Sequence, residues 1–209
     1  IDFLVFSGHK VYAPYGSGAI VGLTEELSDG APLLKGGGCV KAVLDNEVIW
    51  SEPPSLHEAG TPNALGAIAL ARSLKQLKQI GFDNIYEHEM YLKEYLIKEL
   101  KKIDKVILYG DTENIDDRLG IIVFNIEGQD YKKIGKRFAD EMGIALRTGK
   151  FCSHPYVNRL MGISDLTACR EARNNAHPSG MLRASLGLYN TKREADLFIS
   201  YIKYITSTL

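Results

Sequence analysis

One lysine of this chain stands where an amine can react with an aldehyde cofactor. Lys10 ends the sequence Ser-Gly-His-Lys at residues 7–10, directly after an apolar run at residues 1–6. That run predicts a buried strand, and the cationic, partly desolvated setting at its end lowers a lysine's pKa and favours the deprotonated, reactive amine. Ser7 and His9 can hydrogen-bond a phosphate. The alternative is an ordinary solvated lysine that opens a loop.

An arginine near the C-terminus favours the binding of a carboxylate. Arg183 lies in a short apolar segment, residues 181–186, that predicts a strand. An unpaired guanidinium is costly to bury in such a strand, and its planar fork suits a carboxylate. A bound carboxylate is therefore a reasonable partner for Arg183. The alternative partner is an acidic side chain of the protein, in a structural salt bridge.

Cys152 lies in a predicted loop among basic residues. Arg147 and Lys150 precede it in the sequence, and positive charge nearby lowers the pKa of a thiol and makes it a better nucleophile. The alternative is an ordinary free cysteine, which is our interpretation of Cys39 and Cys169. The odd count of three cysteines, with no C-x-x-C pair, argues against a disulfide framework and for a reducing compartment, by default the cytoplasm.

The start of a predicted helix offers a place for an anion. Gly60 and Thr61 stand just before Asn63, a residue type that caps helices, and an apolar helical pattern follows over residues 65–77. Unpaired backbone N–H groups and the helix dipole favour negative charge at such a position. The alternative is simply a well-capped helix.

Four segments together carry a resemblance to a known family. They are Ser-Gly-His-Lys at residues 7–10, Glu-Ala-Gly-Thr-Pro-Asn at 58–63, Arg-Thr-Gly-Lys-Phe-Cys at 147–152 and Arg-Ala-Ser-Leu-Gly-Leu-Tyr-Asn-Thr at 183–191. With these segments the chain resembles the class V aminotransferases, a family of pyridoxal-phosphate enzymes. It is most similar to the branch of cysteine desulfurases and selenocysteine lyases. The resemblance implies an α/β protein with the C-terminal part of the pyridoxal-phosphate-dependent transferase fold.

The resemblance also implies roles for individual residues. It implies that Lys10 is the Schiff-base lysine, that Cys152 accepts sulfur as a persulfide, and that Arg183 binds the substrate's α-carboxylate. It places Arg147 near the mouth of the active site. It implies pyridoxal 5′-phosphate as the cofactor, held by Ser7, His9, Lys10, Gly60 and Thr61. In the family the Gly-Thr segment reaches the neighbouring subunit's cofactor, which implies a homodimer with shared active sites, and a sulfur-acceptor protein is a further expected partner.

The favoured reaction is the removal of sulfur from cysteine to give alanine. In that reaction Lys10 also moves the α-proton of the substrate, and Cys152 takes the sulfur. One alternative keeps the cofactor and makes the protein a class V aminotransferase or another lyase, with Cys152 a bystander. Another is a noncatalytic α/β binding or assembly module.

Two departures from the family pattern shape our expectations. The family's chains normally have a long stretch before the lysine, and that stretch holds the aspartate that pairs with the pyridine nitrogen and the ring that stacks on the cofactor. We therefore expect this chain to be the C-terminal part of an enzyme, inactive by itself, with exposed apolar surface around Phe3, Val5 and Ile20. The second departure is residues 165–177, which look inserted between Cys152 and Arg183.

Composition sets the remaining limits. A net charge of -1 with both signs mixed gives no electrostatic case for nucleic acid or a membrane surface as partner. The five histidines lack the spacing of metal ligands, so no metal is expected. Hydrophobic content of 45% is ample for a packed core. We place a domain boundary near Gly81, so that residues 1–80 are the remnant of the large cofactor domain and residues 81–209 form a small C-terminal domain.

The periodicity of apolar residues predicts alternating strands and helices. Helices are expected over residues 65–77, 85–100 and 134–142, the first after the Asn63 cap, and a last helix is expected after a capping box formed by Thr191 and Glu194. Gly81 and Gly143 are the expected helix stops. Strands are expected at residues 1–6, 19–23, 106–109, 119–126, 144–147 and 181–185.

Overall fold

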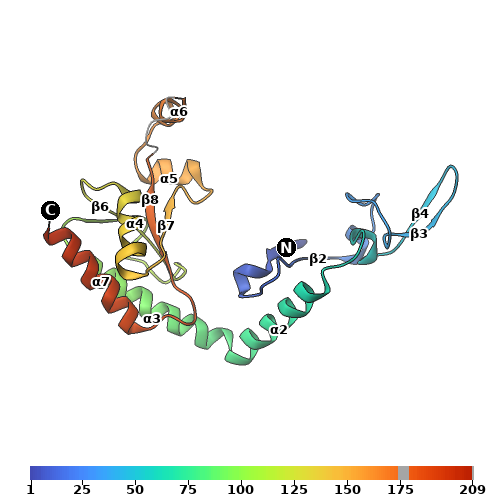
Figure 1. Cartoon of the computed structure of the whole chain (residues 1–209), viewed down its shortest axis with the longest axis horizontal. Coiled ribbons are helices and arrows are strands. Elements are labelled where there is room, and N and C mark those ends of the chain that lie inside the picture. Colours follow the sequence, from blue (N-terminus) through green and yellow to red (C-terminus); the bar gives the residue numbers. More distant parts are fainter. Residues whose placement is uncertain (174–178, 209) are drawn as a thin grey trace. The chain divides into compact units, whose positions relative to one another are not determined.

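The computed structural model describes residues 1–173 and 179–208. The chain forms two compact units, Ile1–Phe82 and Asp83–Leu209 (Figure 1). The division falls next to Gly81, which follows the last turn of helix α2 (Ala64–Ile80) and has a left-handed φ of 91°. A glycine adopts that φ without strain, so the helix ends there, as predicted.

The first unit contains two separate antiparallel hairpins and one long helix. Strands β1 (Phe3–Ser7) and β2 (Gly18–Gly22) pair with Phe3 opposite Gly22. Helix α2 begins at the predicted cap, because the Asn63 side chain accepts a hydrogen bond of 3.0 Å from the Gly66 N–H. The other elements of the unit are 3-10 helices η1 (Gly8–Val11) and η2 (Ser55–His57), helix α1 (Thr24–Leu27), and strands β3 (Val40–Val43) and β4 (Val48–Trp50).

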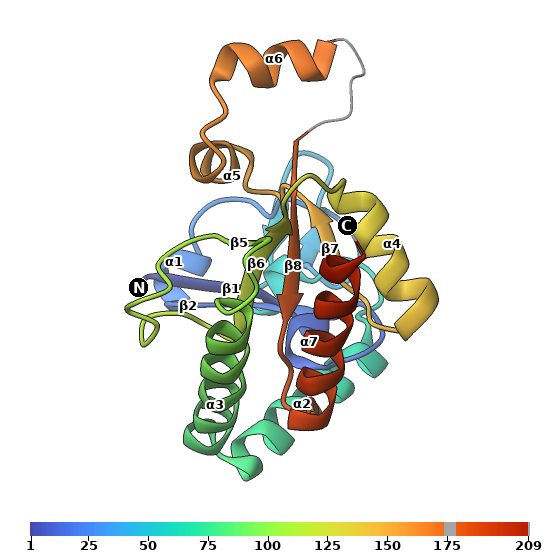
Figure 2. The ribbon, with the colours of Figure 1, turned by 90° about the vertical axis from the view of Figure 1, so that its left-hand side faces the viewer.

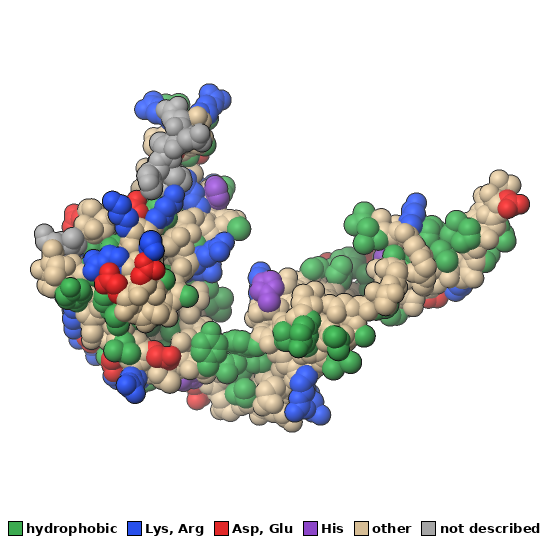
Figure 3. Space-filling view, in the orientation of Figure 1, with side chains coloured by type: hydrophobic (Ala, Val, Ile, Leu, Met, Phe, Trp, Pro, Cys, Tyr) green, Lys and Arg blue, Asp and Glu red, His purple; other side chains and the backbone are tan. Residues whose placement is uncertain are grey.

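The prediction that the first strand is buried is wrong for this unit. β1 pairs only with β2 among the described strands, and its residues 3–5 are exposed. Val5 is 68% exposed, and Phe3 and Ile20 are also exposed, as expected for the chain by itself. Hydrophobic side chains are visible across the surface of this unit in Figure 3. Lys10 is exposed as well, so the partly desolvated setting expected for it is absent from this unit.

The second unit is built on one antiparallel sheet of four strands in the order β5-β6-β8-β7. Figures 1 and 2 show helices α3, α4 and α7 together on one face of the sheet. The strands are β5 (Val106–Leu108), β6 (Ile121–Ile126), β7 (Arg147–Gly149) and β8 (Met181–Ser185), and the helices are α3 (Phe82–Leu100), α4 (Tyr131–Met142), α5 (His154–Leu160), α6 (Asp165–Arg173) and α7 (Lys192–Ser207).

Alternation along β6 explains which face of this sheet is the core. Ile122, Phe124 and Ile126 are buried against the helices, and the ring of Phe124 meets that of Phe198 on α7 edge to face at 5.7 Å. The residues between them point to the opposite face. Because Val123 lies opposite Arg183 of β8, Arg183 belongs to that opposite face, turned away from α4 and α7.

Some predicted bounds differ from the structure for physical reasons. Only Arg147 of the expected strand at residues 144–147 lies in β7, because the ladder with β8 joins Arg147–Gly149 to residues 183–181. Gly143 ends α4 in the left-handed conformation, as predicted. The hairpin of β3 and β4 was not predicted, although an Asp-Asn turn between β-branched residues was a usable signal. The predicted capping box of Thr191 and Glu194 is confirmed.

A lysine on α3 is buried, and its ammonium is held by backbone oxygens. The Lys93 ammonium donates hydrogen bonds to the backbone carbonyl oxygens of Ile115 and Arg118, and thereby fixes the loop between β5 and β6. Burial, followed by the nearby charge of Arg118, lowers the pKa of Lys93. Its role in the fold is to hold this loop through the two carbonyl oxygens.

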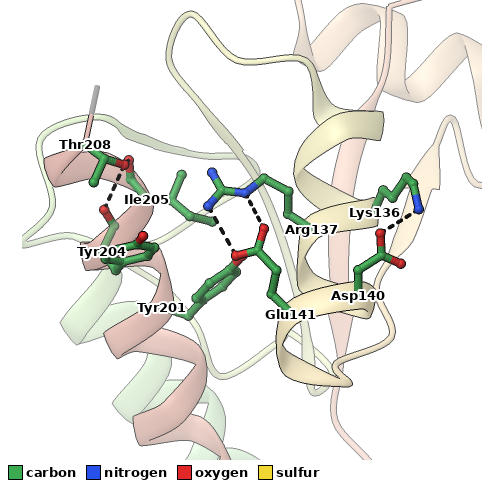
Figure 4. Close-up of polar contacts among 8 residues, drawn as sticks. All are labelled: Lys136, Arg137, Asp140, Glu141, Tyr201, Tyr204, Ile205 and Thr208. Carbon is green, nitrogen blue, oxygen red and sulfur yellow. Dashed lines mark hydrogen bonds and ion pairs between the residues drawn. The ribbon is translucent and has the colours of Figure 1, made fainter.

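A tyrosine between α7 and α4 gives the unit a testable dependence on pH. The Tyr201 hydroxyl donates a hydrogen bond to Glu141, and Glu141 also accepts one of 2.8 Å from Arg137 (Figure 4). Burial, and then the bond to Glu141, raises the pKa of Tyr201 to about 12. An unfolded tyrosine ionises near a pKa of about 10. The folded chain therefore keeps a proton that the unfolded chain loses between about pH 10 and 12.

We expect the Tyr201→Phe variant to lose a part of the alkaline decline in stability. The stabilisation linked to the Tyr201 proton is complete below about pH 10, and above it falls by at most about 1.4 kcal/mol per pH unit. Denaturant unfolding of the chain at pH 8 to 11 should show a shallower decline for Tyr201→Phe than for the parent. The matched control is Tyr204→Phe, an exposed residue on the same helix. Parallel stability curves for the parent and Tyr201→Phe would contradict the assignment.

Candidate active site

Lys10 lies on the short helix η1, which is tied to α2. The Ser73 hydroxyl of α2 donates to the Val11 carbonyl, and the Asn63 amide donates to the Tyr15 carbonyl at 2.7 Å. The helix cap thus also holds the segment that follows the lysine. These bonds fix the backbone on the C-terminal side of Lys10, while its side chain stays exposed.

The turn before Lys10 requires a glycine, because Gly8 packs against Ser17. A Cβ atom on Gly8 would lie 2.4 Å from Ser17 Oγ and 3.2 Å from the Ala13 side chain, so no larger residue fits. The Gly8 N–H donates to the Ser17 carbonyl at 2.7 Å. Ser17 Oγ is buried and has no hydrogen-bond partner among the described residues. Ser17 was not predicted as a site residue, and its sequence context, Tyr-Gly-Ser-Gly, gave only a turn signal.

The Gly-Thr segment stands at the start of α2, as predicted. Gly60 has a left-handed φ of 84°, and its N–H donates to the Gly37 carbonyl at 2.7 Å. Thr61 is exposed just ahead of the Asn63 cap. The Gly-Gly-Gly turn at residues 36–38 therefore supports this segment, a role that its sequence alone did not reveal. Ser7 is half-buried and His9 is exposed, on the same turn as Lys10.

Two arginines meet on the face of the second unit's sheet turned away from α4 and α7. Arg147 of β7 lies directly opposite Arg183 of β8, and like charges in this position repel. Arg183 Nε is buried without a hydrogen-bond partner, and Arg183 makes no ion pair within the described ranges 1–173 and 179–208. The expected alternative, a structural salt bridge to an acidic side chain, is thus absent there. An anion bound between the two arginines would relieve both problems.

Cys152 lies on an unusual turn that follows β7. Phe151 and Cys152 have left-handed φ angles of 53° and 58°, a conformation that is strained for residues with a side chain. The turn joins β7 to α5 and leaves the thiol exposed. The guanidinium carbon of Arg183 lies 5.1 Å from the centre of the Phe151 ring. The predicted nucleophile, Cys152, thus lies on the turn that follows β7, and the predicted carboxylate-binding residue, Arg183, lies on β8, the strand paired with β7.

Asn125 is a polar residue of the same face that sequence reasoning missed. It follows Val123, the partner of Arg183, by two residues, so the pleat places both on one face. Its amide donates to the Gly180 carbonyl at 3.0 Å, while its Oδ1 is buried without a partner in the part of the chain that the structure describes. The alternation of residues 121–126 was the available signal, because a polar residue in a buried strand is unusual.

The other two cysteines differ from Cys152. Cys39 is fully buried, and its thiol donates to the Gly36 carbonyl at 2.9 Å. Cys169 is exposed on α6, within the segment expected to be inserted. All three cysteines are free thiols. Of the segment 165–177, the structure describes α6, and residues 174–177 lie outside the described residues.

The predicted site residues fall into two groups. Ser7, His9, Lys10, Gly60 and Thr61 belong to the first unit, and Arg147, Cys152 and Arg183 belong to the second. Within the second unit, Arg147 lies opposite Arg183 in the sheet, and the Arg183 guanidinium lies over the ring of Phe151, the residue before Cys152.

Comparison with known proteins decides the family. The model of the family described as aminotransferase class-V matches residues 1–198 of this chain. The chain belongs to the class-V aminotransferases. The resemblance predicted from the four sequence segments is therefore confirmed.

Two curated relatives of this class-V aminotransferase chain are named cysteine desulfurases. The cysteine desulfurase of Klebsiella pneumoniae strain 342 is 36% identical over 209 residues, which are 100% of this chain and 46% of that protein. The cysteine desulfurase of Escherichia coli O127:H6 is 37% identical over 206 residues, which are 98% of this chain and 45% of that protein. The chain thus spans about half the length of the curated relatives it matches.

Solved structures establish the fold. The apo cysteine desulfurase of Thermococcus onnurineus NA1 matches with a TM-score of 0.84 and 31% identity, over 100% of this chain and 48% of that one. The cysteine desulfurase CsdA of Escherichia coli matches with a TM-score of 0.83 and 29% identity, over 100% of this chain and 47% of that one. This class-V aminotransferase chain therefore has part of the fold of pyridoxal-phosphate-dependent transferases, as predicted.

Two further observations concern the described residues of the chain. They contain no group of three or more histidine, cysteine or acidic side chains arranged to hold a metal ion. None of the helices among them combines the length and the apolar character that crossing a membrane requires.

Proposed function

We propose that this class-V aminotransferase chain is part of a pyridoxal-phosphate-dependent cysteine desulfurase, which converts cysteine to alanine and an enzyme persulfide. The observation that carries the proposal is the contact of Arg183 with the residue that precedes Cys152. The Arg183 guanidinium, which has no acidic partner among the described residues, lies over the ring of Phe151, and the next residue on this strained turn carries the exposed thiol. Relatives named cysteine desulfurases support the same reaction.

The first unit offers residues that fit the cofactor. Lys10 presents an exposed amine, and Ser17 Oγ beside Gly8 is a buried hydroxyl that lacks a partner in the described part of the chain. We assign the cofactor phosphate to Ser7 and His9 of one subunit and to Gly60 and Thr61 of a second, where hydroxyl and imidazole groups can donate hydrogen bonds. When bound, pyridoxal phosphate supplies an aldehyde and an electron sink. Lys10 Nζ would hold the cofactor through that aldehyde and would accept and return the substrate's α-proton.

The second unit supplies the groups that handle the substrate. Arg183 binds the substrate carboxylate through its free N–H groups, and Arg147 adds positive charge across the strand pair. The Cys152 thiolate attacks the sulfur of the substrate. A sulfur–sulfur bond then forms on Cys152 while the carbon–sulfur bond of the substrate breaks, and the carbon skeleton leaves as alanine after gaining a proton.

The family pattern carries three further parts of the proposal. The Gly-Thr segment at residues 60–61 contributes to the cofactor site of a second subunit, so the working protein is a homodimer. An acceptor protein removes the persulfide sulfur. The three free thiols are suited to a reducing compartment, for which we propose the cytoplasm.

We expect the Arg183→Ala variant of the complete natural protein to lose kcat/KM for cysteine. The loss corresponds to about 2–5 kcal/mol if the guanidinium and the substrate carboxylate form a buried, charge-assisted pair. The assay supplies a panel of L-amino acids and follows the cofactor spectrum, alanine and sulfide. The matched control is Arg193→Ala, an exposed arginine at the start of α7.

Each outcome of that assay has a meaning. Sulfide and alanine from cysteine alone support the desulfurase. A keto acid formed from several amino acids without sulfide would instead support an aminotransferase. No cofactor spectrum at all would support a noncatalytic module. An unchanged kcat and KM in Arg183→Ala would remove this arginine from the site.

A further inference from the structure

A cavity lies in the second unit, and its lining includes Gly149 and Lys150, shortly before Cys152 in the sequence. Its volume is about 320 Å³, and it is formed by the end of β7 together with α5 and α6. Among the described residues, those proposed for catalysis and substrate binding do not line it. The polar side chains that do line it are Tyr131, Lys150, His154, Asn158, Glu171 and Ser179.

Asn158 contributes a buried amide oxygen to the lining of the cavity. Its side chain is 8% exposed, and its Oδ1 accepts no hydrogen bond from any residue in the described ranges. Leaving such a group unpaired is destabilising. Because Asn158 lines the cavity, a hydrogen-bond donor placed inside the cavity would remove this cost.

Lys150 contributes an ammonium that makes no hydrogen bond with the residues that the structure describes. Its side chain is 10% exposed, and its Nζ lies 3.9 Å from Oε2 of Glu171, beyond hydrogen-bond distance. The Glu171 carboxylate instead accepts bonds from the Ser179 hydroxyl and, at 3.1 Å, from the Ser179 N–H. Lys150 therefore keeps its donors for an acceptor inside the cavity, and a negatively charged acceptor would be favoured.

The charges around the cavity have both signs. Lys150 attracts an anion, whereas the Asn158 oxygen and the nearby Glu171 carboxylate attract a donor with positive charge. A molecule that fits both has a carboxylate and an ammonium group close together. We propose that this cavity binds a free α-amino acid, with its carboxylate on Lys150 and its ammonium on Asn158 and Glu171. The site is separate from the one proposed at Arg183.

The test uses the 209-residue chain carrying Arg183→Ala, so that the other carboxylate site is removed. Amide NMR spectra and calorimetry follow a titration with L-alanine. We expect saturable binding, with the largest shifts at residues 149–158 and 168–172. Lys150→Met and Asn158→Leu should each weaken binding at least about 10-fold, the equivalent of one lost charge-assisted bond. Lys136→Met, at an exposed and distant position on α4, should leave it unchanged.

Two simpler ligands test the proposed amino-acid site without any substitution at Lys150 or Asn158. Sodium acetate and ethylamine, each with one of the two charged groups, should bind at least about 10-fold more weakly than L-alanine. Equal binding of acetate and L-alanine would overturn the proposal in favour of a simple anion site. An absence of saturation, or shifts centred elsewhere, would also overturn it. Because Arg183 is already replaced, none of these results bears on the proposed desulfurase reaction.

Discussion

The Lys10→Ala variant of the complete natural protein should lose turnover of cysteine, by at least about 10³-fold, within the range attributed to a positioned proton-transfer group. Lys10 is asked both to hold the cofactor aldehyde and to move the α-proton, so no other group of the turn replaces it. The fold should survive, because the Lys10 side chain is exposed and the backbone around it is held by Asn63 and Ser73.

The measurement for Lys10 is direct. Borohydride reduction of the parent protein should fix the cofactor to the peptide that contains residues 7–10, and the variant should show no such adduct. Lys41→Ala is a suitable control, because Lys41 is an exposed lysine of the same unit that pairs with Glu52 at 2.7 Å. A borohydride-stable lysine adduct in Lys10→Ala would show that another lysine performs this function.

The second large effect concerns sulfur transfer. In the complete natural protein, Cys152→Ser should reduce persulfide formation from cysteine to background, because a hydroxyl at this position is not a thiolate nucleophile. Cofactor absorbance and cysteine binding should remain, since Cys152 is exposed and lies in the second unit. Labelling of persulfide after incubation with cysteine gives the readout.

The control for Cys152 is another thiol of the same unit. Cys169→Ser replaces an exposed cysteine on α6 and should leave persulfide formation intact. Full sulfide release by Cys152→Ser would favour the alternative in which this cysteine is a bystander. Loss of cofactor absorbance in the same variant would point to a structural role for the strained turn instead.

The sequence predicted those parts of the fold that depend on local chemistry. The Asn63 cap, the stops at Gly81 and Gly143 and the capping box at Thr191 each involve bonds between residues a few positions apart. The burial of β1 and the bounds of β7 depend on partners far along the chain, so an apolar run was not enough to predict them.

The candidate site shows the same division. Lys10, Cys152 and Arg183 were visible as residue types in matching motifs. Ser17 and Asn125 were missed. Asn125 stood out only as a polar residue in a buried strand, and the sequence does not show which hydroxyl or amide atoms lack a hydrogen-bond partner among the described residues. Such groups are found only when the hydrogen bonds of the folded chain are counted.

The opposed pair of Arg147 and Arg183 has a kinetic consequence. Two like charges held across adjacent strands create a local positive field, which speeds the arrival of anions and is screened by dissolved ions. The screening length is about 8 Å at physiological ionic strength and grows to about 30 Å at 0.01 M salt. Encounter rates of carboxylates with this face, measured in dilute buffer, will therefore exceed those that prevail in a cell.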